Sequence, residues 1–159
     1  MFLGLDIGSS TWYDAVGLFI LLAGFIIGLG AVTVIDIHGF LGRTSTYWTE
    51  ATTRTHKVTK PLIWIGFALA FIGGAMLYRD QSFAGIPYLH FWLGVLLVAN
   101  GCFLSFDVSP YLLKREKEGL GKTILPSRYQ WAIALSMLVS FFGWWTSLVL
   151  LVAYLLVRY

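Results

Sequence analysis

The chain has 159 residues, of which 58% are hydrophobic and only 12% are charged. Soluble proteins usually carry about 25% charged residues, so this composition excludes a soluble protein of ordinary surface polarity. The formal net charge is +3, and the basic residues flank apolar segments, which indicates contact with anionic lipid head groups rather than with nucleic acid. We expect residues 1–159 to form a single transmembrane domain.

Four apolar segments are long enough to cross a bilayer as helices. A spanning helix needs about 20 mostly apolar residues. In chain order, we expect spans at approximately 15–36, 61–79, 86–107 and 130–157. The segments are continuously apolar and do not alternate, which favours helices over barrel strands. The sequence therefore predicts an all-α fold, a bundle of four transmembrane helices.

The basic residues predict how the bundle is oriented. Lys and Arg accumulate on the cytoplasmic side of membrane proteins. The expected loops at 43–60 and 113–129 contain nine of the eleven Lys and Arg residues. The other side has Arg79 and Arg158, together with the acids Asp6, Asp14 and Asp80. We therefore expect both loops in the cytoplasm and both termini on the non-cytoplasmic side. Since bacterial outer membranes hold barrels, the helical spans point to the bacterial inner membrane.

Small residues predict where the helices meet, because close approach in lipid depends on them. They form stripes at helical spacing in three spans: Gly17, Gly24 and Gly28, then Gly94 and Gly101, then Ser136, Ser140 and Ser147. We expect the bundle to close along these stripes, with contacts to a homodimer or another membrane protein as the alternative. Asn100 is expected to bond across helices. Trp144 and Trp145 fall in mid-span, where we expect them to pack against neighbouring helices.

Four ionisable residues are expected at the cytoplasmic rim of the membrane. They are Asp36, His38, His56 and Asp107. Ionisable groups at membrane depth are costly, and carboxylates with imidazoles can bind a divalent metal or pass protons. Alternatively, Asp36 and Asp107 pair with nearby Lys and Arg side chains and fix the helix ends. Asp107 lies seven residues after Asn100, which predicts one shared helix face. The spacing matches no HExxH or paired CxxC signature, so the metal stays open.

Several short motifs resemble a known group of proteins. They are Gly28–Asp36, Glu50, the apolar segment Ile63–Gly74, Asn100-Gly101 with Pro110, and the Trp144-Trp145 pair. Over roughly residues 15–155, the chain resembles a group of uncharacterised small bacterial integral membrane proteins. That group is similar to the copper-resistance D-type membrane proteins and to small b-type cytochromes. The resemblance implies a four-helix bundle. It also raises a haem b held by His38, His56 or His90, although His90 is expected across the membrane from the other two.

The functional expectation follows from what the sequence contains and from what it lacks. It has no nucleophile elbow, no phosphate-binding loop and no dinucleotide fingerprint, so we do not expect an enzyme. We expect a non-enzymatic membrane subunit that binds a partner or has a structural role. Two alternatives stay open: a haem-binding electron carrier, and an ion- or proton-linked transporter that uses Asp36 and Asp107.

Overall fold

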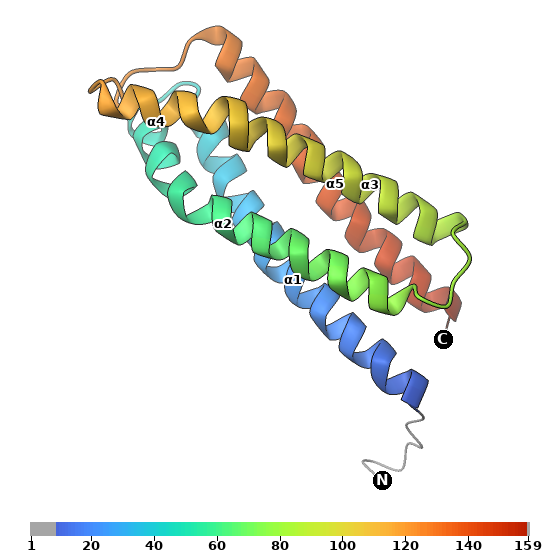
Figure 1. Ribbon diagram of the computed structural model, residues 1–159. Helices are drawn as coiled ribbons and strands as arrows, with labels where there is room; N and C mark the ends of the chain where they lie inside the picture. Colours follow the sequence, from blue (N-terminus) through green and yellow to red (C-terminus); the bar gives the residue numbers. More distant parts are fainter. Residues whose placement is uncertain (1–8, 159) are drawn as a thin grey trace.

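The computed structural model describes residues 9–158, and the side chains of residues 12–158 (Figure 1). Asp6 therefore lies outside the described residues. The elements are α1 (Ser9–Leu41), α2 (Thr46–Leu77), α3 (Gly85–Phe103), the π-helical segment η1 (Leu104–Val108), α4 (Ser109–Lys117) and α5 (Ser127–Arg158). Four helical stretches are long and apolar enough to cross a membrane, with α3, η1 and α4 forming one of them. The predicted all-α architecture with four such helices is confirmed.

The bundle has two ends, which are named here by what they hold. The loop end holds the connections at residues 42–45 and 118–126. The terminal end holds the start of α1, the end of α5 and the connection at residues 78–84 (Figure 1). Helix α1 packs along α2 and also contacts α5, which in turn packs against α3. Most of the basic residues therefore lie at the loop end.

Helix α2 is longer than its apolar segment. Residues 46–60, expected between the first two spans, are helical and continuous with the second span, and Pro61 lies inside the helix. Ser45 caps the start by accepting a hydrogen bond from the backbone N–H of Trp48. This polar stretch buries threonines, and the Thr49 hydroxyl donates to the carbonyl of Gly42 at 2.8 Å. The length of the apolar segment does not reveal this extension of α2, because the buried face of residues 46–60 is made of threonines.

A π-helical segment changes the phase of the third membrane helix. Pro110 has no backbone N–H to donate to the carbonyl of Phe106, and η1 occupies the turn just before Pro110. The wider turn shifts the residues that follow onto a different face. Asn100 therefore points into the bundle while Asp107 is exposed. The prediction that these two residues share a face is wrong for this reason.

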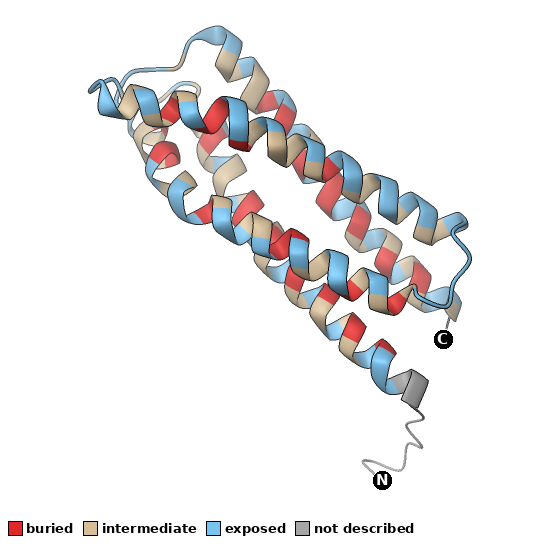
Figure 2. Cartoon of the chain, in the orientation of Figure 1, coloured by how far each residue is buried: buried red, intermediate tan, exposed pale blue. Residues whose placement is uncertain are grey.

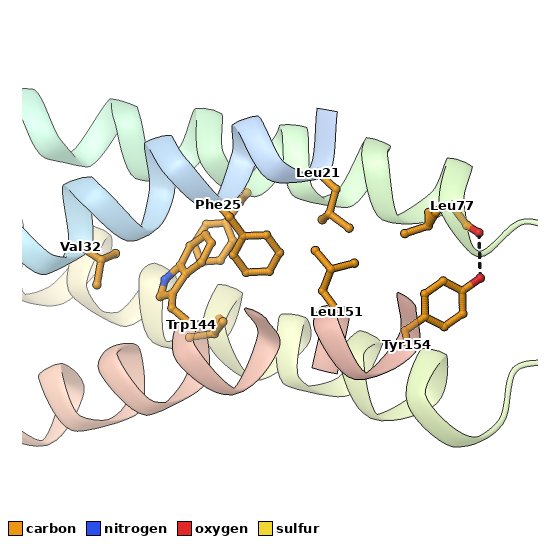
Figure 3. Packing of buried hydrophobic residues seen from close by; sticks show 9 residues of the cluster. Leu21, Phe25, Val32, Leu77, Trp144, Leu151 and Tyr154 are labelled. Atoms are coloured by element: carbon orange, nitrogen blue, oxygen red, sulfur yellow. Dashed lines mark hydrogen bonds between the residues drawn. The ribbon is translucent and has the colours of Figure 1, made fainter. Parts of the chain in front are cut away.

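The core is centred on Trp144, whose exposed fraction is 2%. Its ring meets Phe25 edge-on at a centroid distance of 5.8 Å (Figure 3). It also stacks on Phe67 at a centroid distance of 5.0 Å. Trp145 is 45% exposed, so the packing prediction is confirmed for Trp144 and wrong for Trp145. Buried residues lie on the faces that the helices turn toward one another (Figure 2). The outward faces carry large apolar side chains, as contact with lipid requires.

Glycines bring α1 and α2 into direct backbone contact. A Cβ atom on Gly66 would lie 2.5 Å from Cα of Gly28, and one on Gly24 would lie 2.6 Å from the backbone nitrogen of Ala70. No larger residue fits at either position, so the two helices form a fixed pair. Gly66 was not singled out from the sequence. Gly94 and Gly101 differ, because the nearest atoms to their added Cβ positions are aromatic carbons at 4.0 and 3.4 Å.

Candidate functional site

A cavity of about 70 Å³ lies between the helices in the half of the bundle nearest the loop end. All five α-helices and η1 contribute to its walls. Most of the lining is apolar, and the polar side chains in it are Asp36, Thr52, His56, Lys60, Trp64, Ser105, Ser140 and Trp144. This space is called the Asp36 cavity below. It gathers ionisable groups of α1 and α2 that are far from each other in the sequence.

Asp36 and His56 both line this cavity, and each has a buried side-chain atom without a hydrogen-bond partner among the described residues. Oδ2 of Asp36 and Nε2 of His56 have no hydrogen bond among the described residues. Buried polar groups are nearly always hydrogen-bonded, and ionisable groups at membrane depth are costly. Such atoms need an explanation, and a site that binds protons or a small ligand provides one.

Ion pairing does not explain Asp36. Within residues 12–158, neither Asp36 nor Asp107 takes part in a salt bridge. The alternative prediction, that both carboxylates pair with nearby Lys or Arg side chains, is therefore wrong. Helix α1 also continues beyond Asp36 to Leu41, so Asp36 lies inside the helix and not at its end. The neighbouring acids Glu50 and Glu116 are the ones that pair with basic residues, Arg54 and Lys57.

Lys60 is the third ionisable residue of the cavity, and it has a partner. Its Nζ donates to the backbone carbonyl of Ser105 at 3.1 Å. The Ser105 hydroxyl accepts a hydrogen bond from Nε1 of Trp64 at 3.2 Å. Both bonds tie α2 to the π-helical segment, where an irregular backbone leaves a carbonyl accessible. The Lys60 ammonium is thereby held at one wall.

A smaller cavity of about 10 Å³ extends the site toward the loop end. It shares Gly39 and Thr52 with the Asp36 cavity and adds Arg43 and Gln130. Arg43 lies over the rings of Phe40 and Trp131 at 5.7 and 5.3 Å, and its Nε is buried without a partner in the described part of the chain. Polar groups thus continue from Asp36 to the basic end of the bundle.

The structure separates the other two predicted members of the polar cluster from the cavity. His38 lies against Trp48, with ring centroids 5.0 Å apart, and does not line the cavity. Two residues along an α-helix correspond to a rotation of about 200°, which explains why Asp36 and His38 differ. Asp107 is exposed. Of the four predicted residues, Asp36 and His56 are the two that come together.

The three histidines do not share a site. His56 lines the Asp36 cavity, His90 lines a second cavity in the other half of the bundle, and His38 lines neither. The structure therefore gives no support to a haem held by two histidines. Within the described residues, no group of three or more His, Cys, Asp or Glu side chains is arranged to hold a metal ion.

Asn100 behaves as predicted. Its amide donates to the Ser140 hydroxyl at 2.9 Å and to the Ser136 carbonyl at 3.1 Å. Its carbonyl accepts from the Ser136 hydroxyl at 2.8 Å. This two-way contact joins α3 to α5, and it satisfies the amide inside the bundle. Asn100 is therefore a structural polar residue and not an unpaired one.

Sequence reasoning missed a second polar group, at the terminal end. The carboxylate of Asp14 pairs with Arg79 at 2.8 Å and with Arg158 at 2.6 Å. Arg158 also donates to the carbonyl of Leu77 at 3.0 Å. The two arginines lie 65 and 144 positions from Asp14, so no local pattern could reveal the contact. The network closes α1, α2 and α5 at this end.

Comparisons with protein-family models, with curated proteins and with solved structures gave no match. The family resemblance of the short motifs therefore stays a prediction. A fold does not define an activity, so the proposed function rests on the residues of the Asp36 cavity.

Proposed function

We propose that this protein is a proton-linked permeation unit of a membrane, in which Asp36 and His56 take up and release protons. One observation supports it above the others: both side chains line one cavity, and each has a buried atom without a partner among the described residues. A carboxylate and an imidazole are the side-chain pair best suited to exchange a proton near neutral pH.

The cavity has room for the water that such an exchange needs. A cavity needs about 10–15 Å³ of such space to hold one water molecule, so about 70 Å³ has room for several. A proton that leaves the imidazolium of His56 can reach the Asp36 carboxylate through this water, and the reverse transfer restores the starting state. Lys60 is the remaining ionisable group of the lining, since α3, η1, α4 and α5 contribute none.

Access to the pair differs between the two ends. The smaller cavity with Arg43 and Gln130 extends the Asp36 cavity toward the loop end. On the other side, Phe67, Leu97 and Trp144 line both this cavity and the second one, and so form the layer between them. Transfer across the whole bundle requires this apolar layer to move, which agrees with alternating access around a fixed site.

We also infer that the loop end faces the cytoplasm and that the membrane is the bacterial inner membrane. The inference rests on the nine Lys and Arg residues at the loop end. In a Cys102→Ser background, Gln81→Cys should react with a membrane-impermeant maleimide in intact spheroplasts. Lys122→Cys should react only after permeabilisation. The opposite labelling pattern would contradict the orientation.

Proton flux into liposomes tests the proposed function directly. Purified protein is reconstituted with a trapped pH-sensitive dye, and an imposed pH gradient is followed with valinomycin and potassium present. We expect the wild-type protein to collapse the gradient several-fold faster than empty liposomes. Asp36→Asn should reduce the rate to that of empty liposomes, and His56→Gln should reduce it strongly.

Asp107→Asn is the matched control, because Asp107 is a carboxylate near the same end that is exposed and outside the cavity. It should leave the rate unchanged. Equal rates for wild type and Asp36→Asn, or a wild-type rate equal to that of empty liposomes, would refute proton permeation through Asp36. The partner-binding role expected from composition would then be the better hypothesis.

A further inference from the structure

A second and larger cavity, of about 280 Å³, lies in the half of the bundle nearest the terminal end. Aromatic side chains form much of its wall, among them Phe25, Phe67 and Trp144. No Asp, Glu, Lys or Arg of the described residues lines it. It is called the His90 cavity below, after the imidazole in its wall. A site without charged groups in an apolar bundle fits a neutral ligand.

The cavity reaches the surface that faces lipid. Phe71 of α2 and Phe91 of α3 both line it, and they are 47% and 40% exposed. Their ring centroids lie 6.3 Å apart, so the two side chains meet across the space between these helices. Gly94 lines the same wall and contributes no side chain. A ligand dissolved in the bilayer can therefore enter sideways between α2 and α3.

A bonded polar pair stands in this largely apolar wall. The hydroxyl of Tyr78 lies 2.8 Å from Nδ1 of His90. Phe25 stacks on the His90 ring at 6.2 Å, and Tyr78 packs edge-on against Tyr154 at 4.7 Å, so both rings are held in place. Among the described residues, the His90 ring makes no second hydrogen bond. Its other nitrogen, Nε2, is therefore available to a ligand.

The hydrogen bond to Tyr78 determines what Nε2 can do. When the Tyr78 hydroxyl donates to Nδ1, Nε2 carries the proton and donates to a carbonyl oxygen. When Nδ1 donates to the Tyr78 oxygen, Nε2 accepts from a hydroxyl. The pair can thus bind a ring oxygen in either its carbonyl or its hydroxyl form.

We propose that the His90 cavity binds a lipid-soluble ring that carries a carbonyl group, of the isoprenoid quinone class. The volume lies just below the range of about 300–1,000 Å³ typical for small-molecule sites, which suits a head ring whose tail passes between α2 and α3 beside the exposed rings of Phe71 and Phe91. The aromatic walls stack on such a ring. A plain acyl chain would leave Nε2 of His90 unpaired in an apolar site.

The assignment does not rest on the proposed proton pathway. The two cavities have only Phe67, Leu97 and Trp144 in common, and none of these contributes an ionisable group. Loss of proton flux after Asp36→Asn and loss of ring binding after changes at His90 are therefore separate results.

Binding of decyl-ubiquinone to the purified full chain in detergent micelles tests this assignment. The probe quenches tryptophan fluorescence, and Trp144 lines the cavity. We expect saturable binding by the wild-type protein. His90→Phe keeps an aromatic ring beside Phe25 but removes the hydrogen bond, and it should raise Kd about three- to tenfold. Gly94→Leu should raise Kd at least tenfold, because its side chain occupies the cavity.

The chain offers matched controls for both variants. A Cβ on Gly94 meets only Phe71 Cε2, at 4.0 Å, and one on Gly30 meets nothing within 4 Å, so neither leucine disturbs backbone packing. Gly30 lies outside both cavities, and Gly30→Leu should bind the probe as the wild type does. His56→Phe, in the other cavity, should do the same.

Three results would overturn the assignment. The first is quenching that does not saturate with the wild-type protein. The second is an unchanged Kd in both His90→Phe and Gly94→Leu. The third is equal displacement of the probe by a decyl chain without a ring, which would identify the site as a groove for acyl chains.

Discussion

Asp14 and Asp36 are both carboxylates of helix α1, but they differ in the partners that the bundle provides for them. At the terminal end, Asp14 is buried and bonded to two guanidinium groups. Toward the loop end, Asp36 has a buried oxygen without a partner in the described part of the chain. Removing one partner of a buried ion pair destabilises a fold strongly, whereas a buried polar group without partners is itself retained at a cost to stability. The difference separates a structural carboxylate from a functional one.

The contrast extends to the surroundings of each carboxylate. At the terminal end, Arg79 lies over the ring of Tyr13 at 5.5 Å, Arg158 lies over Tyr154 at 5.6 Å, and Tyr154 donates to the carbonyl of Leu77 (Figure 3). Near the loop end lie all four buried side-chain atoms that lack partners among the described residues, in Asp36, His38, Arg43 and His56. The charged groups around Asp14 form a closed network, whereas the ionisable groups around Asp36 have buried atoms without partners among the described residues.

The largest expected effect on stability is that of Asp14→Ala, which tests the contrast between the two carboxylates. It removes the shared partner of Arg79 and Arg158 and leaves two charges at the end of the bundle. We expect a loss of about 3 kcal/mol in the free energy of unfolding. This is the low end of the range for buried ion pairs, because the two arginines are 30% and 22% exposed. The measurement is unfolding in mixed micelles with increasing dodecyl sulfate, followed by circular dichroism.

Asp80→Ala is the control for this loss. Asp80 also pairs with Arg79, at 3.0 Å, but its side chain is 67% exposed. An exposed ion pair contributes little, so this variant should stay within about 0.5 kcal/mol of the wild type. Similar losses in both variants would mean that the position of Asp14 inside the bundle has no special role.

Asn100→Leu examines an intermediate case, a satisfied polar group in the middle of the bundle. The change removes three hydrogen bonds between α3 and α5. We expect a loss of about 1.5 kcal/mol, near the upper limit measured for polar contacts between membrane helices. Thr146 carries an exposed hydroxyl on α5 and serves as the control, so Thr146→Leu should leave the unfolding free energy unchanged. An Asn100→Leu protein as stable as the wild type would show that the amide contact adds nothing to packing.

Much of the fold could be predicted because its signals are local. Four apolar segments predict four helices. Asn100 was expected to bond across helices and the serine stripe was expected at a helix contact, and the structure joins the two between α3 and α5. Local signals fail where the backbone departs from a uniform α-helix. The π-helical segment moves Asp107 away from the face of Asn100, and the buried threonines of α2 extend that helix beyond its apolar segment.

The candidate site could be predicted only in part, because it depends on helix rotation and on distant partners. Depth along the membrane normal placed Asp36, His38, His56 and Asp107 together, but depth does not determine which face a residue occupies. Packing of α1 on α2 turns Asp36 and His56 toward one cavity and leaves His38 beside Trp48. The pairing of Asp14 likewise required the ends of α2 and α5 to be placed in space.

Asp36→Leu should have the smallest effect on stability and the opposite sign. The substitution removes a buried oxygen that has no partner among the described residues, and the adjacent cavity of about 70 Å³ has room for the larger side chain. We expect a gain of about 0.5–1 kcal/mol in the free energy of unfolding, together with loss of proton flux, as is common where function requires an unfavourable group. Asp107→Leu, at an exposed carboxylate, should change neither quantity. A loss of stability as large as that of Asp14→Ala would show that Asp36 supports the fold, and the distinction between the two carboxylates of α1 would fail.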